Sequence, residues 1–246
     1  MSDGQKKFLI IGHRGLPGSA PENTLKSFRM ALLSGADGVE LDVQLSKDGV
    51  PVAFHDFTTG RMCGQDTPIS AMNFAEIRNL KVAGSEPIPT LKEALESLSG
   101  KAVFVELKIS ATRDVSYRRN VCGRIREVIE SSRMKENVII TSFDHDGLRL
   151  YRELDRRQQI GIIYDRESMA FYVERGMDPE SIIDSYSILI PDYTYHTADD
   201  IRLLSEHGKK IFPWTVNDPG IAKVMKDAGC SGIITDFADR MLLLQD

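Results

Sequence analysis

The stretch DGVELDVQLSKDGVPVAFHD, residues 37–56, decides the fold and contains the first indication of a site. Every second residue of its first half is apolar, as is typical of a β-strand: Val39, Leu41, Val43 and Leu45. Glu40 and Asp42 therefore share the opposite face of that strand. Gly49 indicates a turn, after which PVAF forms a second strand that ends at His55. We therefore expect two acids and a histidine to lie close together.

This hairpin alone is compatible with two interpretations. An exposed edge hairpin can carry a polar face without penalty, because water solvates the charges. Two carboxylates beside a histidine are equally typical of a metal site or an acid/base site. The remainder of the sequence has to distinguish the two.

Length and composition indicate a globular protein with a large core. The 246 residues match a single barrel of alternating strands and helices, which typically needs roughly 250. Apolar residues make up 41% and charged residues 27%, values that argue against a disordered chain or a membrane protein. The net charge of -5, without any run of Lys or Arg, argues against nucleic-acid binding.

The cysteines and the N-terminus indicate a cellular location. Cys63, Cys122 and Cys230 are odd in number and scattered, so neither a disulfide framework nor a zinc site is predicted, and a reducing compartment fits best. MSDGQKK runs directly into FLIIG, which is too short for a signal peptide or a transmembrane helix. We expect a cytoplasmic protein without a transmembrane segment. The sequence does not predict an oligomeric state.

Buried strands and amphipathic helices alternate along the chain. Eight strands are predicted, each followed by a helix, at residues 8–13, the hairpin 37–56, 103–108, 138–143, 160–164, 187–191, 210–216 and 232–236. This pattern predicts an α/β fold, a closed (β/α)8 TIM barrel, and no Gly-rich dinucleotide fingerprint follows the first strand. Residues 57–90 break the pattern, so we interpret them as a small insertion after strand 2 within one catalytic domain, residues 1–246.

Polar residues gather where this fold has its active site, at the carboxyl ends of the strands. They are His13, Arg14, Glu40, Asp42, Glu106, Lys108, Trp214, Asn217 and Asp236. Unpaired carboxylates inside a barrel would be strongly unfavourable, and a bound cation removes that problem. Three carboxylates without a thiolate form an all-oxygen site, which suits Mg2+, Ca2+ or Mn2+ rather than zinc.

The motifs of this chain closely resemble those of the glycerophosphodiester phosphodiesterases. They are HRG, PENT, ELD within VELDVQLSKDGVPVAFHD, ELK, WTVN and TD, and the resemblance extends over nearly the whole chain. It implies metal ligands Glu40, Asp42 and Glu106, an acid/base pair His13 and His55, and phosphate contacts Arg14 and Lys108. The attacking group that it implies is the glycerol 2-hydroxyl, although direct attack by water stays open.

Four other residues have more than one interpretation. Glu22 either stabilises the start of a helix through the helix dipole or orients a catalytic side chain. Trp214 either fills the barrel or forms a wall against the substrate's glycerol. Asn217 and Asp236 either belong to the polar group at the strand ends or only cap the helices that follow them.

The resemblance predicts an enzyme that hydrolyses glycerophosphodiesters, which are deacylated phospholipids, to an alcohol and sn-glycerol 3-phosphate. An alternative is a lysophospholipase D-type activity with the same site. That activity needs an apolar lip, for which residues 57–90 offer Met62, Ile69, Met72, Phe74, Ile77 and Leu80, although these residues equally suit a small core. A non-catalytic binding barrel is disfavoured, because every expected acid, base and phosphate ligand is present.

Overall fold

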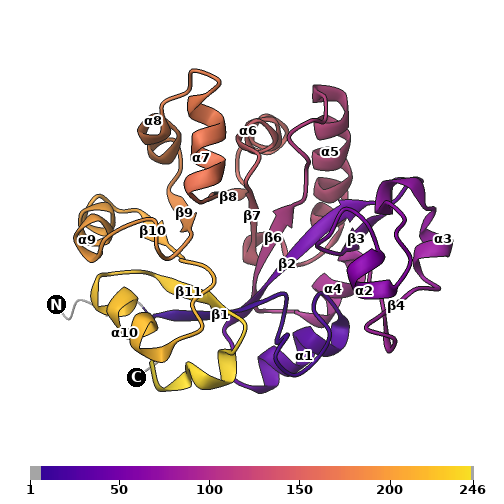
Figure 1. Ribbon diagram of the computed structural model, residues 1–246, viewed down its shortest axis with the longest axis horizontal. Helices are drawn as coiled ribbons and strands as arrows, with labels where there is room; N and C mark the ends of the chain where they lie inside the picture. The colour runs from indigo at the N-terminus through magenta and orange to yellow at the C-terminus, as the bar shows by residue number, and fades with distance from the viewer. Residues whose placement is uncertain (1–6, 245–246) are drawn as a thin grey trace.

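The computed structural model describes residues 7–244 and is a nearly closed barrel of eight parallel strands surrounded by helices (Figure 1). The barrel strands are β1 (Leu9–His13), β2 (Gly38–Leu45), β6 (Ala102–Leu107), β7 (Val138–Ser142), β8 (Gln159–Tyr164), β9 (Ile188–Pro191), β10 (Lys210–Ile211) and β11 (Gly232–Thr235). Their order in the sheet is β10-β9-β8-β7-β6-β2-β1-β11. The predicted TIM barrel is therefore confirmed.

Backbone hydrogen bonds after β10 join the two ends of this sheet. Ser231 N donates to Ile211 O and Ile234 N to Pro213 O, each at 2.9 Å. The strand predicted at 210–216 is regular only over Lys210–Ile211, which corrects its length. Pro213 has no N–H to donate toward β11, so the ladder there is irregular.

The helices begin at polar caps, as their sequences predict. They are α1 (Leu25–Leu33), α4 (Leu91–Ser97), α5 (Val115–Ser131), α6 (His145–Leu154), α7 (Arg166–Val173), α8 (Pro179–Asp184), α9 (Ala198–Glu206) and α10 (Pro219–Asp227). Thr24, for example, accepts a hydrogen bond from Ser27 N at the start of α1. The last strand is not followed by an α-helix but by two 3-10 turns, Ala238–Arg240 and Leu242–Leu244. Phe237, which precedes the first turn, has no side-chain group to cap a helix.

Strand β2 is buried on both faces, which excludes the interpretation of 37–56 as an exposed edge hairpin. Its apolar residues Val39 and Leu41 belong to the large core between strands and helices. Its polar residues therefore point into the barrel. Strand β3 (Pro51–Ala53) pairs antiparallel with β2, as the turn at Gly49 predicts. A second apolar cluster fills the barrel interior, where the rings of Phe104 and Phe212 lie 5.0 Å apart.

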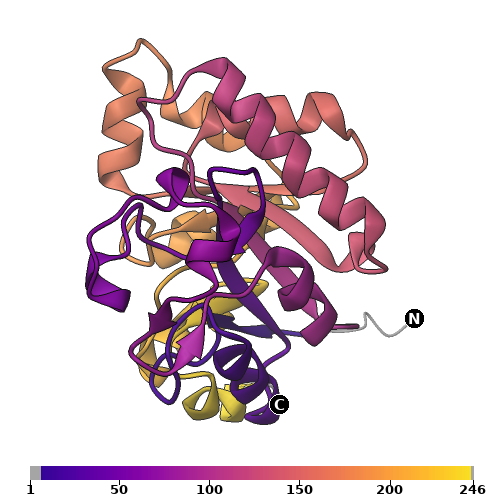
Figure 2. The ribbon, with the colours of Figure 1, turned by 90° about the vertical axis from the view of Figure 1, so that its right-hand side faces the viewer.

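Residues 57–90 form a lobe beside β3, at one side of the barrel (Figures 1 and 2). The lobe contains α2 (Gly60–Cys63), a 3-10 turn (Ile69–Ala71), α3 (Phe74–Ile77) and the hairpin of β4 (Lys81–Val82) and β5 (Glu86–Pro87). It has its own apolar cluster, which includes all six residues considered for a lipid lip. Three of them are buried there, with exposed fractions of 0% for Ile69 and Ile77 and 9% for Met72. The other three, Met62, Phe74 and Leu80, pack against this cluster and are only partly buried.

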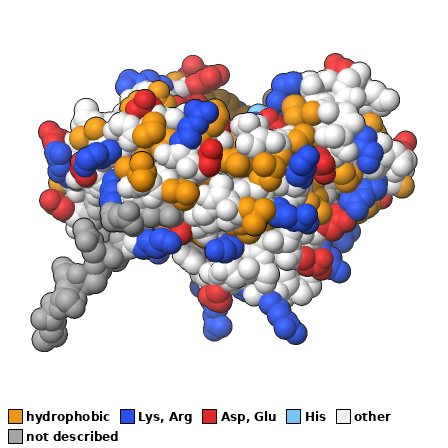
Figure 3. Space-filling model, turned by 90° about the horizontal axis from the view of Figure 1, so that it is seen from below, with side chains coloured by type: hydrophobic (Ala, Val, Ile, Leu, Met, Phe, Trp, Pro, Cys, Tyr) orange, Lys and Arg blue, Asp and Glu red, His pale blue; other side chains and the backbone are white. Residues whose placement is uncertain are grey.

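The molecular surface agrees with the composition. On the face that Figure 3 shows, acidic and basic side chains are intermixed, unlike the basic stripe of a nucleic-acid-binding protein. Within residues 7–244, no helix combines the length and the apolar character that crossing a membrane requires.

Candidate active site

Three buried carboxylates meet inside the barrel at the carboxyl ends of β2 and β6. Asp42 and Glu106 are neighbours in the parallel register of these strands, and Glu40 lies two residues before Asp42 on the same face. One oxygen of each carboxylate lies within 4.8 Å of the others. Their exposed fractions are 4% for Glu40, 0% for Asp42 and 7% for Glu106. Like charges are thus held together out of contact with water.

This crowding changes the acidity of the three groups. Burial raises the pKa of Glu40 well above its ordinary value, and the charges of Asp42 and Glu106 raise it further. Burial also raises the pKa of Glu106, and Lys108 offsets only part of that effect. For Asp42, burial alone would raise the pKa, but Lys108 and Arg14 together hold it well below its ordinary value.

The carboxylates fit a hard divalent cation. All three donors are oxygens, and Asp42 Oδ1 is buried without a hydrogen-bond partner. The Lys108 ammonium lies 3.6 Å from that oxygen. A cation bound at Glu40, Asp42 and Glu106 would complete the coordination of this oxygen and neutralise the repulsion.

Two basic side chains flank the carboxylates. Lys108 Nζ lies 2.8 Å from Glu106 Oε1. Arg14 lies 3.2 Å from Asp42 through Nε, in an ion pair that is not aligned as a hydrogen bond, and its backbone N–H donates to Glu40 at 3.1 Å. The turn that places Arg14 here has a left-handed backbone (φ 53°), and it continues into Gly15, where a Cβ would lie 2.4 Å from Ser27 Oγ.

Asn23 is a site residue that the sequence interpretation missed. Its amide donates to Asp42 Oδ2 at 2.8 Å, and its carbonyl oxygen accepts from Asp42 N at 3.2 Å. Asn23 is 1% exposed and has a left-handed backbone, a conformation that asparagine tolerates better than most residues. The PENT motif contained this signal, although the helix cap there is Thr24.

Each of the two candidate catalytic histidines is held by a carboxylate. His13 Nδ1 lies 2.7 Å from Asp236 Oδ1, and Asn217 holds that carboxylate by donating to Oδ2 at 2.8 Å. The interpretation of Asn217 and Asp236 as helix caps is therefore wrong, since Asp218 caps α10. These contacts leave Nε2 as the nitrogen that His13 can present to a ligand.

His55 is arranged similarly, with Nδ1 2.7 Å from Asp56 Oδ1. Burial lowers the pKa of His55, although the charge of Asp42 opposes this effect. Arg61, from the lobe, connects the surroundings of His55 to the other side of the site. Its guanidinium donates to Asp56 at 2.6 Å and to Glu22 at 2.6 Å. The sequence interpretation missed Arg61.

The two remaining candidates lie at the edge of this arrangement. Glu22 accepts from Arg14 at 3.1 Å and lies outside helix α1, which favours its interpretation as an orienting residue. Trp214 donates to Ile190 O at 3.0 Å and packs on the interior cluster, with its ring 5.5 Å from that of Phe143. These contacts favour barrel filling for Trp214.

Comparisons with known proteins agree on one family. The profile of the glycerophosphoryl diester phosphodiesterase family matches residues 13–240. A glycerophosphodiester phosphodiesterase of Caldanaerobacter subterraneus is 32% identical over 97% of this chain and 98% of its own length. A solved glycerophosphodiester phosphodiesterase of Thermotoga maritima has a TM-score of 0.77 and 31% identity, covering 98% of this chain and 99% of that chain. An Oleispira antarctica phosphodiesterase was solved in complex with the product sn-glycerol-3-phosphate. Its TM-score is 0.83 and its identity is 26%, and the match covers 96% of this chain and 95% of that chain.

The carboxylate cluster predicts a pH-dependent penalty in the protein without a divalent cation. Because the pKa of Glu40 is raised in the folded state, that state keeps a proton that the unfolded state releases above its ordinary pKa of 4.5. The free energy of unfolding therefore falls as the pH rises from 4.5. Glu40→Gln removes this contribution, so the variant should gain stability relative to the wild type between pH 4.5 and 8. Urea denaturation in excess chelator measures the difference.

Glu206→Gln is the control, because Glu206 is exposed on α9. It should follow the wild type at every pH. At about a hundred times its Kd, Mg2+ should stabilise the wild type by ~2.7 kcal/mol, and it should stabilise Glu40→Gln less. A constant stability difference between Glu40→Gln and wild type across this pH range would contradict the electrostatic account.

Proposed function

The chain belongs to the glycerophosphoryl diester phosphodiesterase family, and on that premise we propose that it hydrolyses glycerophosphodiesters to an alcohol and sn-glycerol 3-phosphate. The observation that carries this proposal is the buried triad of Glu40, Asp42 and Glu106 with two cations beside it. The relative from Oleispira antarctica, solved with sn-glycerol-3-phosphate, supports the choice of product. The lysophospholipid alternative has less support, because three of the residues considered for an apolar lip, Ile69, Met72 and Ile77, are buried in the lobe's own cluster.

Charge complementarity explains the choice of a phosphodiester. When bound at the triad, Mg2+, Ca2+ or Mn2+ would supply positive charge to the substrate's phosphate oxygens. Arg14 and Lys108 now face the carboxylates, and neutralisation of those carboxylates would leave both side chains available to the phosphate. Negative charge grows on the phosphate oxygens during the reaction, so these contacts stabilise the transition state more than the bound substrate.

The two histidines are proposed to move the protons. The lowered pKa of His55 keeps its imidazole neutral near pH 7, which suits the base that takes the proton from the attacking hydroxyl. His13 is then the acid that protonates the leaving alcohol through Nε2. Asp236 holds the Nδ1 side of the His13 ring and so keeps Nδ1 away from the substrate.

The remaining proposals concern the whole chain. Residues 1–246 act as one catalytic domain, and residues 57–90 form an insertion that supplies Arg61 to the site. The three cysteines are free, which supports a cytoplasmic location.

An assay of both products tests the proposed function. Glycerophosphocholine and glycerophosphoethanolamine should each yield equal amounts of the free alcohol and sn-glycerol 3-phosphate. Excess chelator should abolish the reaction and Mg2+, Ca2+ or Mn2+ should restore it, because the triad offers only oxygen ligands. Release of a phosphorylated alcohol with free glycerol, or full activity in chelator, would refute the proposal. A lysophospholipid assayed in parallel should react far more slowly.

The histidine roles make a second prediction. His13→Ala and His55→Ala should each lower kcat by roughly 100-fold or more while cation affinity is nearly unchanged. The wild-type rate should depend on pH with a bell shape, whose two pKa values belong to the pair. The 4-nitrophenyl diester of glycerol 3-phosphate needs no protonation of its leaving group, so it should partly rescue His13→Ala and not His55→Ala. Two variants with near wild-type kcat would exclude the two-histidine mechanism, and His207→Ala is the exposed control.

Arg61 should act as a positioning residue. Arg61→Met removes the bridge between Asp56 and Glu22, so kcat should fall about 10-fold, with a smaller effect on KM. Arg61→Lys should recover only part of this loss, because an ammonium cannot bind two carboxylates in the plane of a guanidinium. Arg78→Met, which breaks an ion pair between the lobe and Glu93 of α4, is the matched control. Equal kcat values for the Arg61→Met and Arg78→Met variants would contradict the role.

A further inference from the structure

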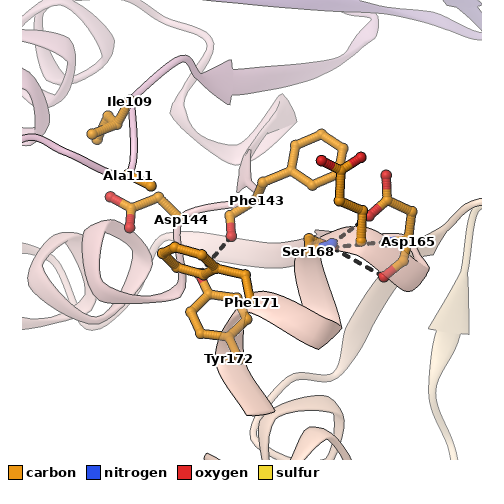
Figure 4. A pocket seen from close by; sticks show the side chains of 9 residues that line it. Ile109, Ala111, Phe143, Asp144, Asp165, Ser168, Phe171 and Tyr172 are labelled. Atoms are coloured by element: carbon orange, nitrogen blue, oxygen red, sulfur yellow. Dashed lines mark hydrogen bonds between the residues drawn. The ribbon is translucent and has the colours of Figure 1, made fainter. Parts of the chain in front are cut away.

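We propose that a cavity beside the catalytic site binds the alcohol part of the substrate and selects alcohols that carry a positive charge, such as small amino alcohols. The cavity has a volume of about 300 Å³ and lies at the carboxyl ends of β6, β7 and β8 (Figure 4). Its walls include Ile109, Phe143, Asp144, Asp165 and Tyr172. This inference rests on the proposed function, because it names which substrates that site prefers.

Strand register places the cavity next to the phosphate contact Lys108. Glu106 is paired with Thr141 in the parallel register of β6 and β7, and Lys108 and Phe143 each follow two residues after this pair. Ser142 Oγ donates to Leu107 O at 2.8 Å, which shows that the two chains still run together there. Ile109 follows Lys108 directly and lines the cavity. An alcohol joined to a phosphate at Lys108 would therefore extend toward this space.

The charge of the cavity walls is negative. Three carboxylates line it and no Lys or Arg does, among the residues that the structure describes. Asp144 is paired with Arg118 at 2.6 Å, behind the wall. Asp165 caps α7 by accepting from Ser168 N at 2.7 Å, without an ion pair, and Glu167 lies exposed at the rim. Asp165 and Glu167 thus leave negative charge in the cavity walls that no ion pair among the described residues neutralises.

Aromatic rings form the other walls. Figure 4 shows Asp144 and Asp165 on opposite sides, with Phe143, Phe171 and Tyr172 between them. Tyr172 is fixed by a hydrogen bond from its hydroxyl to Phe143 O at 2.7 Å. Arg175 already stacks on Phe171, at 3.7 Å from the ring centroid, so this aromatic group attracts cations.

Carboxylates and aromatic faces together suit an ammonium group. A positively charged alcohol gains from both, whereas glycerol or inositol would leave the carboxylates unneutralised. A volume of about 300 Å³ accommodates a small head group rather than an acyl chain. The phosphate of such a diester would lie at the positively charged Arg14 and Lys108, and its ammonium would lie in the negatively charged cavity.

Substrate competition tests the inference. The values of kcat/KM are measured for glycerophosphoethanolamine, glycerophosphocholine and the neutral glycerophosphoglycerol. The wild type should prefer the two cationic diesters. In Asp165→Asn/Glu167→Gln this preference should fall about 5-fold or more, because two carboxylates are lost while asparagine keeps the cap of α7. Glu167→Gln alone, an exposed change that cannot disturb folding, should lower the preference by about 2-fold.

Glu174→Gln/Glu180→Gln is the matched control, since it removes two exposed charges outside the cavity. Its preference should equal that of the wild type. Hydrolysis of all three diesters with the same preference in the wild type and the cavity variant would overturn this inference and leave the proposed function intact. An equal fall in the control would also overturn it, as a general effect of charge. Failure to hydrolyse any of the three diesters would overturn both.

Discussion

The structure depends on the burial of three carboxylates inside one end of a barrel. Buried charges of one sign repel each other strongly, and desolvation penalises each of them as well. The residues around Glu40, Asp42 and Glu106 offset these effects in different ways. Lys108 and Arg14 supply positive charge, and Asn23 supplies directed hydrogen bonds to Asp42. One oxygen of Asp42 still lacks a hydrogen-bond partner, and a divalent cation bound at the three carboxylates would coordinate it.

The same surroundings would prepare the site for a phosphodiester. Arg14 and Lys108 are held beside carboxylates before any substrate arrives, so little reorganisation is needed when a phosphate replaces those partners. Each histidine has one nitrogen fixed by a carboxylate, which leaves the other nitrogen for proton transfer. In the proposed mechanism, the binding of charge is thus separated from the movement of protons.

The rim of the barrel extends the site in two directions. On one side, Arg61 joins the lobe to the surroundings of both Arg14 and His55, so the lobe has a structural connection to the chemistry. On the other side, the acidic cavity begins one residue beyond Lys108. The strand ends hold the groups that we propose for the reaction, and the loops beyond them supply the contacts that would distinguish substrates.

The amino-acid sequence alone determined the strands, most helices and the shared strand face of Glu40 and Asp42, because these features follow from local periodicity and capping. Its motifs also pointed to the residues of the triad, Glu40, Asp42 and Glu106, which the structure brings together. The exposed or buried state of β2, the shortened strand at Pro213 and the absence of a final helix needed the structure. The structure was also needed to identify the partners of His13 and Glu22. Asp236 is 223 residues from His13 in the chain, and Arg61 is 39 residues from Glu22. Such pairs carry no local pattern, because only the closing of the barrel and the packing of the lobe bring them together.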